Sequence, residues 1–328
     1  MTTVIEKPKP SLPSPFSSTI PNFQTTWDST SLGWLKDCPR LYQYQMIEGW
    51  APQGSNIHLT FGSLYAGGVE HYARFRAEGL SHGDATTSMI RWVLETAGSR
   101  DEDGTWTPWD PPPTHRDANI KNRYTLIRSL VWNVEARIGS PYRTVIKANG
   151  QPAVEESFNF YAFDVGGEPI HFAGHLDEVV EDTFNGDLFV ADDKTTKGAL
   201  GAGYFKNYSP NNQVSLYAVA GKIVLSRPIR GVLIRAAQIG VTFTRFEQRP
   251  IPRPPAVLDE WFHETKYWIT QAKKFAEEGY WPMNDKSCGN FGGCPFIEVC
   301  SRSPHHRKAW LEDSFVHHEW NPLIPRGE

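Results

Sequence analysis

The stretch GHLDEVVEDTFNGDLFVADDKTTK, residues 174–197, holds the carboxylates and the lysine that are best placed to do chemistry. Asp177 falls on one predicted strand, and Asp192 and Lys194 fall on the next. Because residues two apart on a strand point to the same face, Asp192 and Lys194 project together while Asp193 points away. An antiparallel pairing of the two strands would bring Asp177 beside Asp192.

This set of side chains suits phosphodiester hydrolysis. Two adjoining carboxylates repel each other unless a cation lies between them, and hard oxygen ligands favour Mg²⁺ or Mn²⁺. A lysine beside that ion can orient water or neutralise charge that develops on a phosphate. Asp-x-Lys alone is a weak signal, since a surface hairpin with ordinary ion pairs can contain it. The apolar Leu-Phe-Val-Ala run before Asp192 instead favours the end of a buried strand.

Gln213 and Tyr217 follow on the next predicted helix. Their i, i+4 spacing puts both on one helical face. Such a pair is usually structural, but its position directly after Asp-x-Lys gives it weight.

Alternating helical and strand patterns indicate the elements that position these residues. Strands are expected at 154–163, 170–181, 187–195 and 230–239. Helices are expected at 61–78, 84–97, 116–138, about 209–225 with Ser209 as its cap, and about 257–278. The order predicts an α/β or α+β core, a mixed sheet flanked by helices, with a helical insertion at 80–150.

Composition fits a soluble globular protein. Of 328 residues, 39% are hydrophobic and 21% are charged, which suits one large domain or two small ones. No run of eighteen apolar residues and no secretory signal is present, so we expect a cytoplasmic protein. The net charge of −4 does not decide for or against nucleic acid. Residues 1–24 are rich in Pro and Ser and are expected to form a disordered tail.

The chain has four cysteines, Cys38, Cys288, Cys294 and Cys300. Three of them cluster near the C-terminus, as Cys-x5-Cys-x5-Cys, among glycines that let the backbone turn tightly. Four thiolates can hold a [4Fe–4S] cluster or a zinc ion, and the spacing leaves both open, although the Cys-x2-Cys pairs typical of zinc are missing. Four unrelated buried cysteines are the remaining alternative, because a reducing cytoplasm disfavours disulfides.

The motif set resembles the RecB-like branch of the PD-(D/E)XK nuclease superfamily. Gly174 to Asp177 resembles its second motif, Asp192-Asp193-Lys194 its third, and Gln213 through Tyr217 its glutamine–tyrosine motif. The resemblance implies that Asp177, Asp192 and the backbone carbonyl of Asp193 bind the metal. It also implies that Lys194 serves the attacking water and that Gln213 and Tyr217 contact DNA. Glu156, on the strand before, also fits the family pattern.

The cysteines are similar to those of the iron–sulfur nucleases of the AddB type and the CRISPR-associated exonucleases. One cysteine precedes the nuclease core in these relatives and three follow it, so that a [4Fe–4S] cluster staples the two ends together. Cys38-Pro39-Arg40 matches the leading element, and Cys294 through Cys300 the closing one, while the gap after Cys288 is wider than usual. The resemblance implies a single nuclease domain at 25–328, with the cluster residues at 286–302.

These patterns lead us to expect a metal-dependent DNA exonuclease that acts on single strands or DNA ends, in recombination, repair or phage DNA metabolism. No P-loop motif is present, so a separate helicase or recombination protein is the expected partner. The rival hypothesis is a DNA-binding or scaffold subunit that keeps the fold and cleaves weakly. It rests on Ala66, which stands where the family has a metal-binding histidine. Glu70, one helical turn on, is a better-placed substitute than His71. The alternative is that neither residue contributes, because two aspartates and a backbone carbonyl can hold a metal without an imidazole.

Overall fold

The computed structural model describes residues 13–54, 56–290 and 293–324. The chain divides into two compact units, where the sequence led us to expect a single domain. The first, which we call the sheet unit, comprises Gly54–Phe158 and His175–Phe262. The second, the cysteine unit, comprises Met1–Gln53, Asn159–Gly174 and His263–Glu328.

All four predicted strands are confirmed. They are β6 (Val154–Val165), β7 (Glu168–Asp182), β8 (Leu188–Thr196) and β9 (Gly231–Ile239). A further strand, β10 (Thr244–Pro252), pairs antiparallel with β9 and was missed. Its sequence TRFEQRPIP is mostly polar and contains two prolines, which suits an edge strand but not the apolar pattern expected of a core strand.

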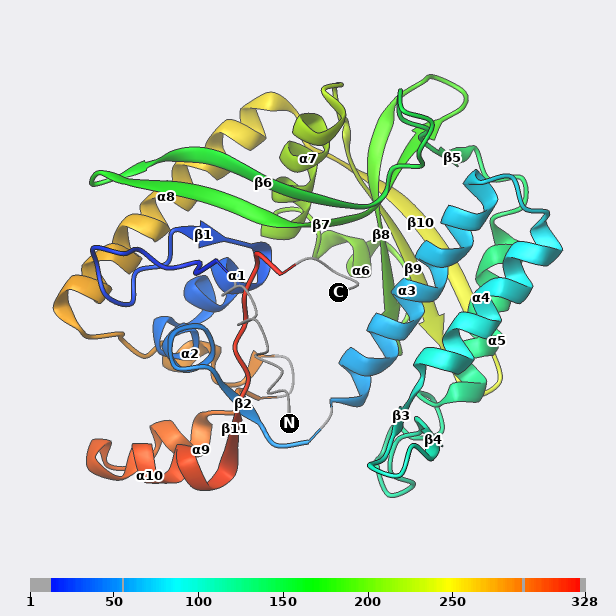
Figure 1. The fold of residues 1–328 in the computed structure, drawn as a ribbon. Helices are drawn as coiled ribbons and strands as arrows, with labels where there is room; N and C mark the ends of the chain where they lie inside the picture. Colours follow the sequence, from blue (N-terminus) through cyan, green and yellow to red (C-terminus); the bar gives the residue numbers. More distant parts are fainter. Residues whose placement is uncertain (1–12, 55, 291–292, 325–328) are drawn as a thin grey trace, which may run out of the picture. The chain divides into compact units, whose positions relative to one another are not determined.

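The sheet is mixed, and its strand order in the sheet unit is β7-β8-β9-β10 (Figure 1). β7 and β8 are antiparallel, with register pairs from Glu178↔Ala191 to Glu181↔Leu188. β8 and β9 are parallel, so the chain between them must cross over, and it does so through two helices, α6 (Ala202–Lys206) and α7 (Asn212–Leu225). A short strand, β5 (Tyr142–Thr144), also pairs with β7.

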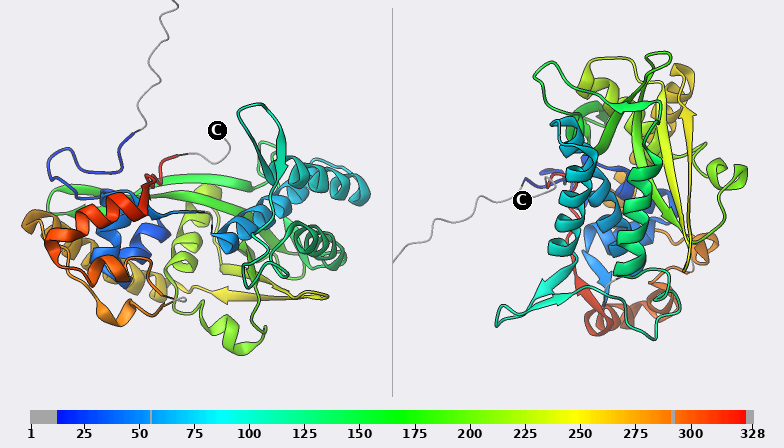
Figure 2. Two further views of the ribbon diagram at one scale, coloured as in Figure 1. Left: turned by 90° about the horizontal axis from the view of Figure 1, so that it is seen from below. Right: turned by 90° about the vertical axis from the view of Figure 1, so that its right-hand side faces the viewer.

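Three helices, α3 (Ile57–Ala77), α4 (His82–Thr96) and α5 (Arg123–Ala136), lie side by side in the sheet unit (Figures 1 and 2). They share a buried hydrophobic cluster with Ala237 and Ile239 of β9. The expected insertion is thus helical, with the small hairpin of β3 (Gly98–Arg100) and β4 (Trp106–Pro108) added to it. α5 begins later than the predicted residue 116 because Asn122 forms a capping box with Thr125.

α7 packs on the other face of the sheet. A Cβ atom at Gly221 would lie 2.7 Å from Val190 Cγ2 of β8, so this glycine lets the helix approach the strand closely. The prediction that Ser209 caps this helix is wrong. The side chain of Asn211 accepts a hydrogen bond from the Val214 N–H, and the helix therefore begins two residues later than the sequence suggested.

The cysteine unit is built from short elements around most of α8 (Pro255–Glu278). In chain order the other complete elements are β1 (Thr26–Trp27), α1 (Ser29–Asp37), α2 (Pro39–Tyr42), η1 (Gln43–Ile47), β2 (Trp50–Pro52), η2 (Asp285–Ser287), α9 (Ile297–Cys300), α10 (Pro304–Ser314) and β11 (Phe315–His317). The end of β6 and the start of β7 also belong to this unit. β11 pairs antiparallel with β2, so chain segments from opposite ends of the sequence meet in this unit (Figure 1).

Residues 13–24, expected to belong to a tail without a core, are part of this unit. Phe16 forms a β-bridge with Gln24, and the side chains of Phe23 and Gln24 are fully buried. The folded part of the chain therefore begins before residue 24, and the rest of the expected tail lies outside the described residues. Within the described part of the chain, no helix has the length and hydropathy needed to cross a lipid bilayer.

The contact between α7 and β8 yields a matched pair of substitutions. Gly83→Ala, in an open position on α4, should stabilise the protein by about 0.5–1 kcal/mol through helix propensity. Gly221→Ala should instead destabilise it by about 1–3 kcal/mol, because the new methyl group overlaps Val190. Urea denaturation of both variants measures the difference, and an equal gain in stability from the two would contradict this packing.

Candidate active site

Asp192 and Lys194 lie side by side on the face of β8 that α7 covers. Lys194 Nζ is 2.8 Å from Asp192 Oδ2 and donates a hydrogen bond of 2.9 Å to Gln213 Oε1 on α7. Gln213 Nε2 in turn donates to the Tyr217 hydroxyl at 3.1 Å. The structure thus links four of the residues selected from the sequence into one chain of polar contacts.

Asp177 approaches the same group from β7. The antiparallel ladder begins at Glu178↔Ala191, and the same register continued by one residue sets Asp177 opposite Asp192. Both carboxylates are buried, with 8% and 2% of the residue surface exposed. The negative charge of Asp177 also acts on Lys194, which shows that the three ionisable groups share one site.

Lys194 carries its proton at neutral pH. Burial lowers the pKa of its ammonium group, but the charge of Asp192, the hydrogen bond to Asp192 and the charge of Asp177 together outweigh burial and raise that pKa above its usual value. The side chain is therefore a cation fixed between a carboxylate and an amide, well suited to hold an anionic oxygen and poorly suited to accept a proton.

Asp193 points to the opposite face, as the alternation along the strand predicted. Its carboxylate accepts a hydrogen bond of 2.6 Å from Arg137, the residue that caps α5. Beside it, Glu178 of β7 accepts from Arg235 of β9 at 2.5 Å and from the Thr144 hydroxyl at 2.6 Å. Two carboxylates and two guanidinium groups thus balance one another, and they join the three central strands behind the candidate site.

Two tyrosines of the site were missed in the sequence. Tyr204 on α6 and Tyr208 just after it have their hydroxyl groups 3.0 Å apart, and the charge of Asp192 acts on both. Burial raises the pKa of each phenol, so both remain neutral. The Arg253 guanidinium donates to the backbone carbonyl of Tyr208 at 2.6 Å and fixes this turn. The i, i+4 spacing in YFKNY, directly before Gln213, was the available signal.

Helix α3, where the family pattern has a histidine, packs against the Asp193 face of β8. A Cβ atom at Gly62 would lie 4.0 Å from Thr195 Oγ1 on that face. His71 stacks on Trp92, with ring centroids 4.2 Å apart, and its Nδ1 is 3.0 Å from the Gly67 carbonyl oxygen. His71 is therefore engaged with α4 and the preceding turn of its own helix, while Glu70 is a buried carboxylate.

Two further residues from the sequence analysis have structural partners. Tyr217 is buried, with 6% of its surface exposed, and its hydroxyl accepts the hydrogen bond from Gln213. Glu156 forms an ion pair with Lys147.

The four cysteines gather in the cysteine unit around a cavity of about 340 Å³. Cys38 Sγ accepts a hydrogen bond of 3.3 Å from the Asn284 backbone N–H. Burial raises the pKa of the Cys294 thiol, and the charges of Cys288 and Cys38 add to that effect. All four sulfur atoms are free thiols, and together they could hold a metal ion or cluster.

No group of three or more His, Cys, Asp and Glu side chains is arranged as a finished metal-ligand set among residues 13–54, 56–290 and 293–324.

The buried ion network behind the site makes a prediction for stability and its pH dependence. Burial works to raise the pKa of Glu178, but Arg235 and Arg137 outweigh it and hold that pKa below its usual value. A carboxyl whose pKa is lower in the folded than in the unfolded protein stabilises the fold at pH values above its unfolded pKa. This contribution is lost as the pH falls through the folded pKa. Arg235→Met should move the loss to higher pH and lower the free energy of unfolding by about 3–5 kcal/mol.

Arg230→Met is the matched control, because Arg230 forms an exposed ion pair with Asp187. It should lower the free energy of unfolding by less than about 1 kcal/mol. Urea denaturation across an acidic pH series provides both quantities. Equal losses in the two variants would show that the buried network does not hold the strands together.

Comparison with known proteins identifies the family to which this chain belongs. The profile of the PD-(D/E)XK nuclease superfamily matches residues 29–301. No curated protein matches the chain. One solved structure, described as "Crystal structure of SSO0001", has 13% identity, covers 53% of this chain and 67% of its own, and superposes with a TM-score of 0.28, which is too low to support an argument. The profile spans both candidate sites and most of the chain, and the protein therefore belongs to the PD-(D/E)XK nuclease superfamily.

Proposed function

We propose that this protein is a divalent-metal-dependent nuclease that hydrolyses phosphodiester bonds in DNA, as an exonuclease acting on single strands or ends. The observation that carries the proposal is the pairing of Asp192 with Lys194 on one face of β8, with Asp177 set opposite. Membership in the superfamily supports hydrolysis of nucleic acid, and the preference for DNA ends follows from the resemblance to the RecB-like branch.

The residues present fit a divalent ion. Asp192 is buried, and its Oδ2 lies 2.8 Å from Lys194 Nζ, the ion-pair partner. A buried carboxylate oxygen with lone pairs to spare and a second carboxylate nearby form an all-oxygen donor set, which suits Mg²⁺ or Mn²⁺. Asp177, Asp192 and the backbone carbonyl of Asp193 would hold the ion, which supplies Lewis-acid activation of the phosphate and of water.

The protein's own groups then have separable roles. The Lys194 ammonium, held in place by Asp192 and Gln213, donates to an oxygen of the phosphate or to the attacking water and offsets negative charge as it develops. Gln213 and Tyr217 fix the direction of that ammonium group, and Tyr217 acts through Gln213 because it is buried. Tyr204 and Tyr208 form a neutral wall beside the site.

We also propose that the four cysteines hold a [4Fe–4S] cluster. The four cysteines line one cavity of about 340 Å³, which has room for a group larger than a single ion. The Asn284 N–H bonded to Cys38 Sγ, and the Arg40 and Arg307 charges that act on Cys300, would offset the negative charge of a thiolate-bound cluster. Such a cluster would join α1 and α2 to the C-terminal segment.

The alanine at position 66 supports a second candidate function. His71, the nearest imidazole on that helix, is stacked on Trp92, so the site lacks the histidine that the family pattern has. A site with oxygen ligands alone binds metal more weakly, and a nucleic-acid-binding subunit with little cleavage activity would have the same features. Digestion of end-labelled DNA with added Mn²⁺ distinguishes the two.

Replacing Asp192 or Lys194 tests the catalytic proposal. Asp192→Asn should abolish metal-dependent cleavage, and Lys194→Met should slow it by at least about a hundredfold, because a charge that stabilises the transition state is lost. Digestion of end-labelled single- and double-stranded DNA measures both. Lys222→Met, on the exposed end of α7, is the matched control and should cleave at the parental rate. Parental rates in all three variants would show that this group is not the active site.

Metal analysis tests the cluster. Protein purified without air should be brown and contain about four irons per chain. Cys300→Ser should lose both colour and iron, while Ser301→Ala, at the adjacent position, should keep them. If protein produced with ample iron and without oxygen contains zinc and no iron, the cysteines hold zinc and the proposed cluster is wrong.

A further inference from the structure

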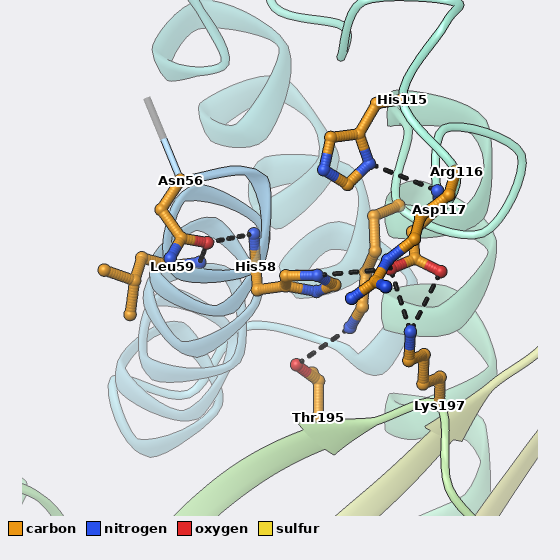
Figure 3. A network of polar contacts seen from close by, with 9 residues as sticks. Asn56, His58, Leu59, His115, Arg116, Asp117, Thr195 and Lys197 are labelled. Carbon is orange, nitrogen blue, oxygen red and sulfur yellow. Dashed lines mark hydrogen bonds and ion pairs between the residues drawn. The ribbon is translucent and has the colours of Figure 1, made fainter. Parts of the chain in front are cut away.

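A cluster of cationic side chains lies just beyond the end of β8. Asp117 is its centre, with a side chain that is only 7% exposed. Lys197 Nζ donates to both of its carboxylate oxygens, at 3.1 and 2.9 Å, and His58 Nε2 lies 3.3 Å from Oδ2. Arg116 Nε is 3.7 Å from the same oxygen. Figure 3 shows these side chains converging from α3, from the loop before α5 and from the chain after β8.

A buried lysine adds to this charge. Lys121 is 2% exposed, and its Nζ lies 4.1 Å from the centroid of the Phe61 ring. It donates one hydrogen bond, of 3.2 Å, to Thr195 Oγ1. An ammonium group has three donors, so two of them have no side-chain acceptor among the described residues. Burial lowers the pKa of Lys121 to about 8, and the charge of Asp117 acts against that shift.

The charges in this cluster do not balance. One carboxylate faces Lys121, Lys197 and Arg116, together with His58 when it is protonated. The network behind the active site pairs two carboxylates with two arginines, so an excess of cations is a distinguishing feature of the Asp117 cluster. Three of its members remain accessible, since the side chains of Arg116, Lys197 and His58 are 80%, 47% and 42% exposed.

The position of the cluster relates it to the candidate active site. Lys197 follows Lys194 by three residues on the same segment of chain. Three residues of extended chain span about 10 Å. Lys194 faces α7 whereas Thr195, which Lys121 contacts, faces α3, so a nucleic acid strand held at Lys194 would reach the cluster by passing around the end of β8.

We propose that Lys197, Arg116 and His58, with the buried charge of Lys121 behind them, form a second phosphate-binding subsite, organised by Asp117, which holds a backbone phosphate of the nucleic acid a few nucleotides from the bond that is cleaved. The inference rests on the proposed nuclease function and deepens it. Asp117 draws the cations together without cancelling their charge. Its subsite contacts the backbone and not the bases, so it adds affinity without sequence preference.

Salt-dependent binding tests the subsite. Anisotropy of a fluorescein-labelled single-stranded oligonucleotide is measured in EDTA, which prevents cleavage, at a series of KCl concentrations. Lys197→Gln and Arg116→Gln should each reduce the slope of log Kd against log [KCl] by about 0.7, the value for a single strand, and weaken binding about fivefold near ~0.1 M salt. Lys222→Gln removes the same charge from an exposed position on α7 and should keep the parental slope.

Asp117→Asn separates a phosphate subsite from a merely structural ion pair. Without the competing carboxylate, the variant should bind the oligonucleotide at least as tightly as the parent protein. If Asp117→Asn and Lys197→Gln lower only the melting temperature and leave the salt slope unchanged, the cluster is structural and the subsite is wrong. The same follows if the parent protein does not bind the oligonucleotide at all.

The two proposals fail differently. A protein that binds with the predicted slopes but does not cleave DNA with Mn²⁺ would retain the subsite and reject the nuclease activity. A protein that cleaves normally, with parental slopes in both glutamine variants, would retain the activity and reject the subsite.

Discussion

The alternation of side chains along β8 is the constraint on which the candidate site depends. Asp192 and Lys194 face α7, where Gln213 receives the lysine, while Asp193 and Thr195 face α3 and α5. A slip of one residue in the register would exchange the two sets and place Asp193 where the chemistry is proposed. The parallel ladder with β9 extends from Phe189↔Gly231 to Thr196↔Gln238 and fixes the register along the whole strand.

Each face of the strand has its own electrostatic arrangement. On the α7 face, the charges of Asp192 and Asp177 both act on Lys194, and the two carboxylates supply the oxygen ligands proposed for a divalent ion. On the opposite face, two carboxylates and two guanidinium groups neutralise one another. One face can therefore stabilise the strands while the other is proposed to bind a ligand. In the same way, the excess of cations around Asp117 is available to an anion.

Much of the sheet unit could be predicted from the sequence because its determinants are local. The apolar run before Asp192 and the two-residue spacing of Asp192 and Lys194 in β8 depend only on neighbouring residues. The edge strand β10 could not be predicted in this way, since its pairing with β9 replaces the apolar pattern that a core strand needs. The i, i+4 spacing of Tyr204 and Tyr208 is visible in the sequence, but their place beside Asp192 depends on the path of the crossover between β8 and β9. The division into two units likewise depends on contacts far apart in the sequence.

The most direct test of this account is the location of a divalent ion in a crystal soaked with Mn²⁺, measured by anomalous scattering. The account predicts a peak between the carboxylates of Asp177 and Asp192, on the α7 face of β8, with Lys194 beside it. A peak at the side chains of Asp193 and Glu178, or none near β8 in protein that cleaves DNA with Mn²⁺, would contradict the assignment of the active site.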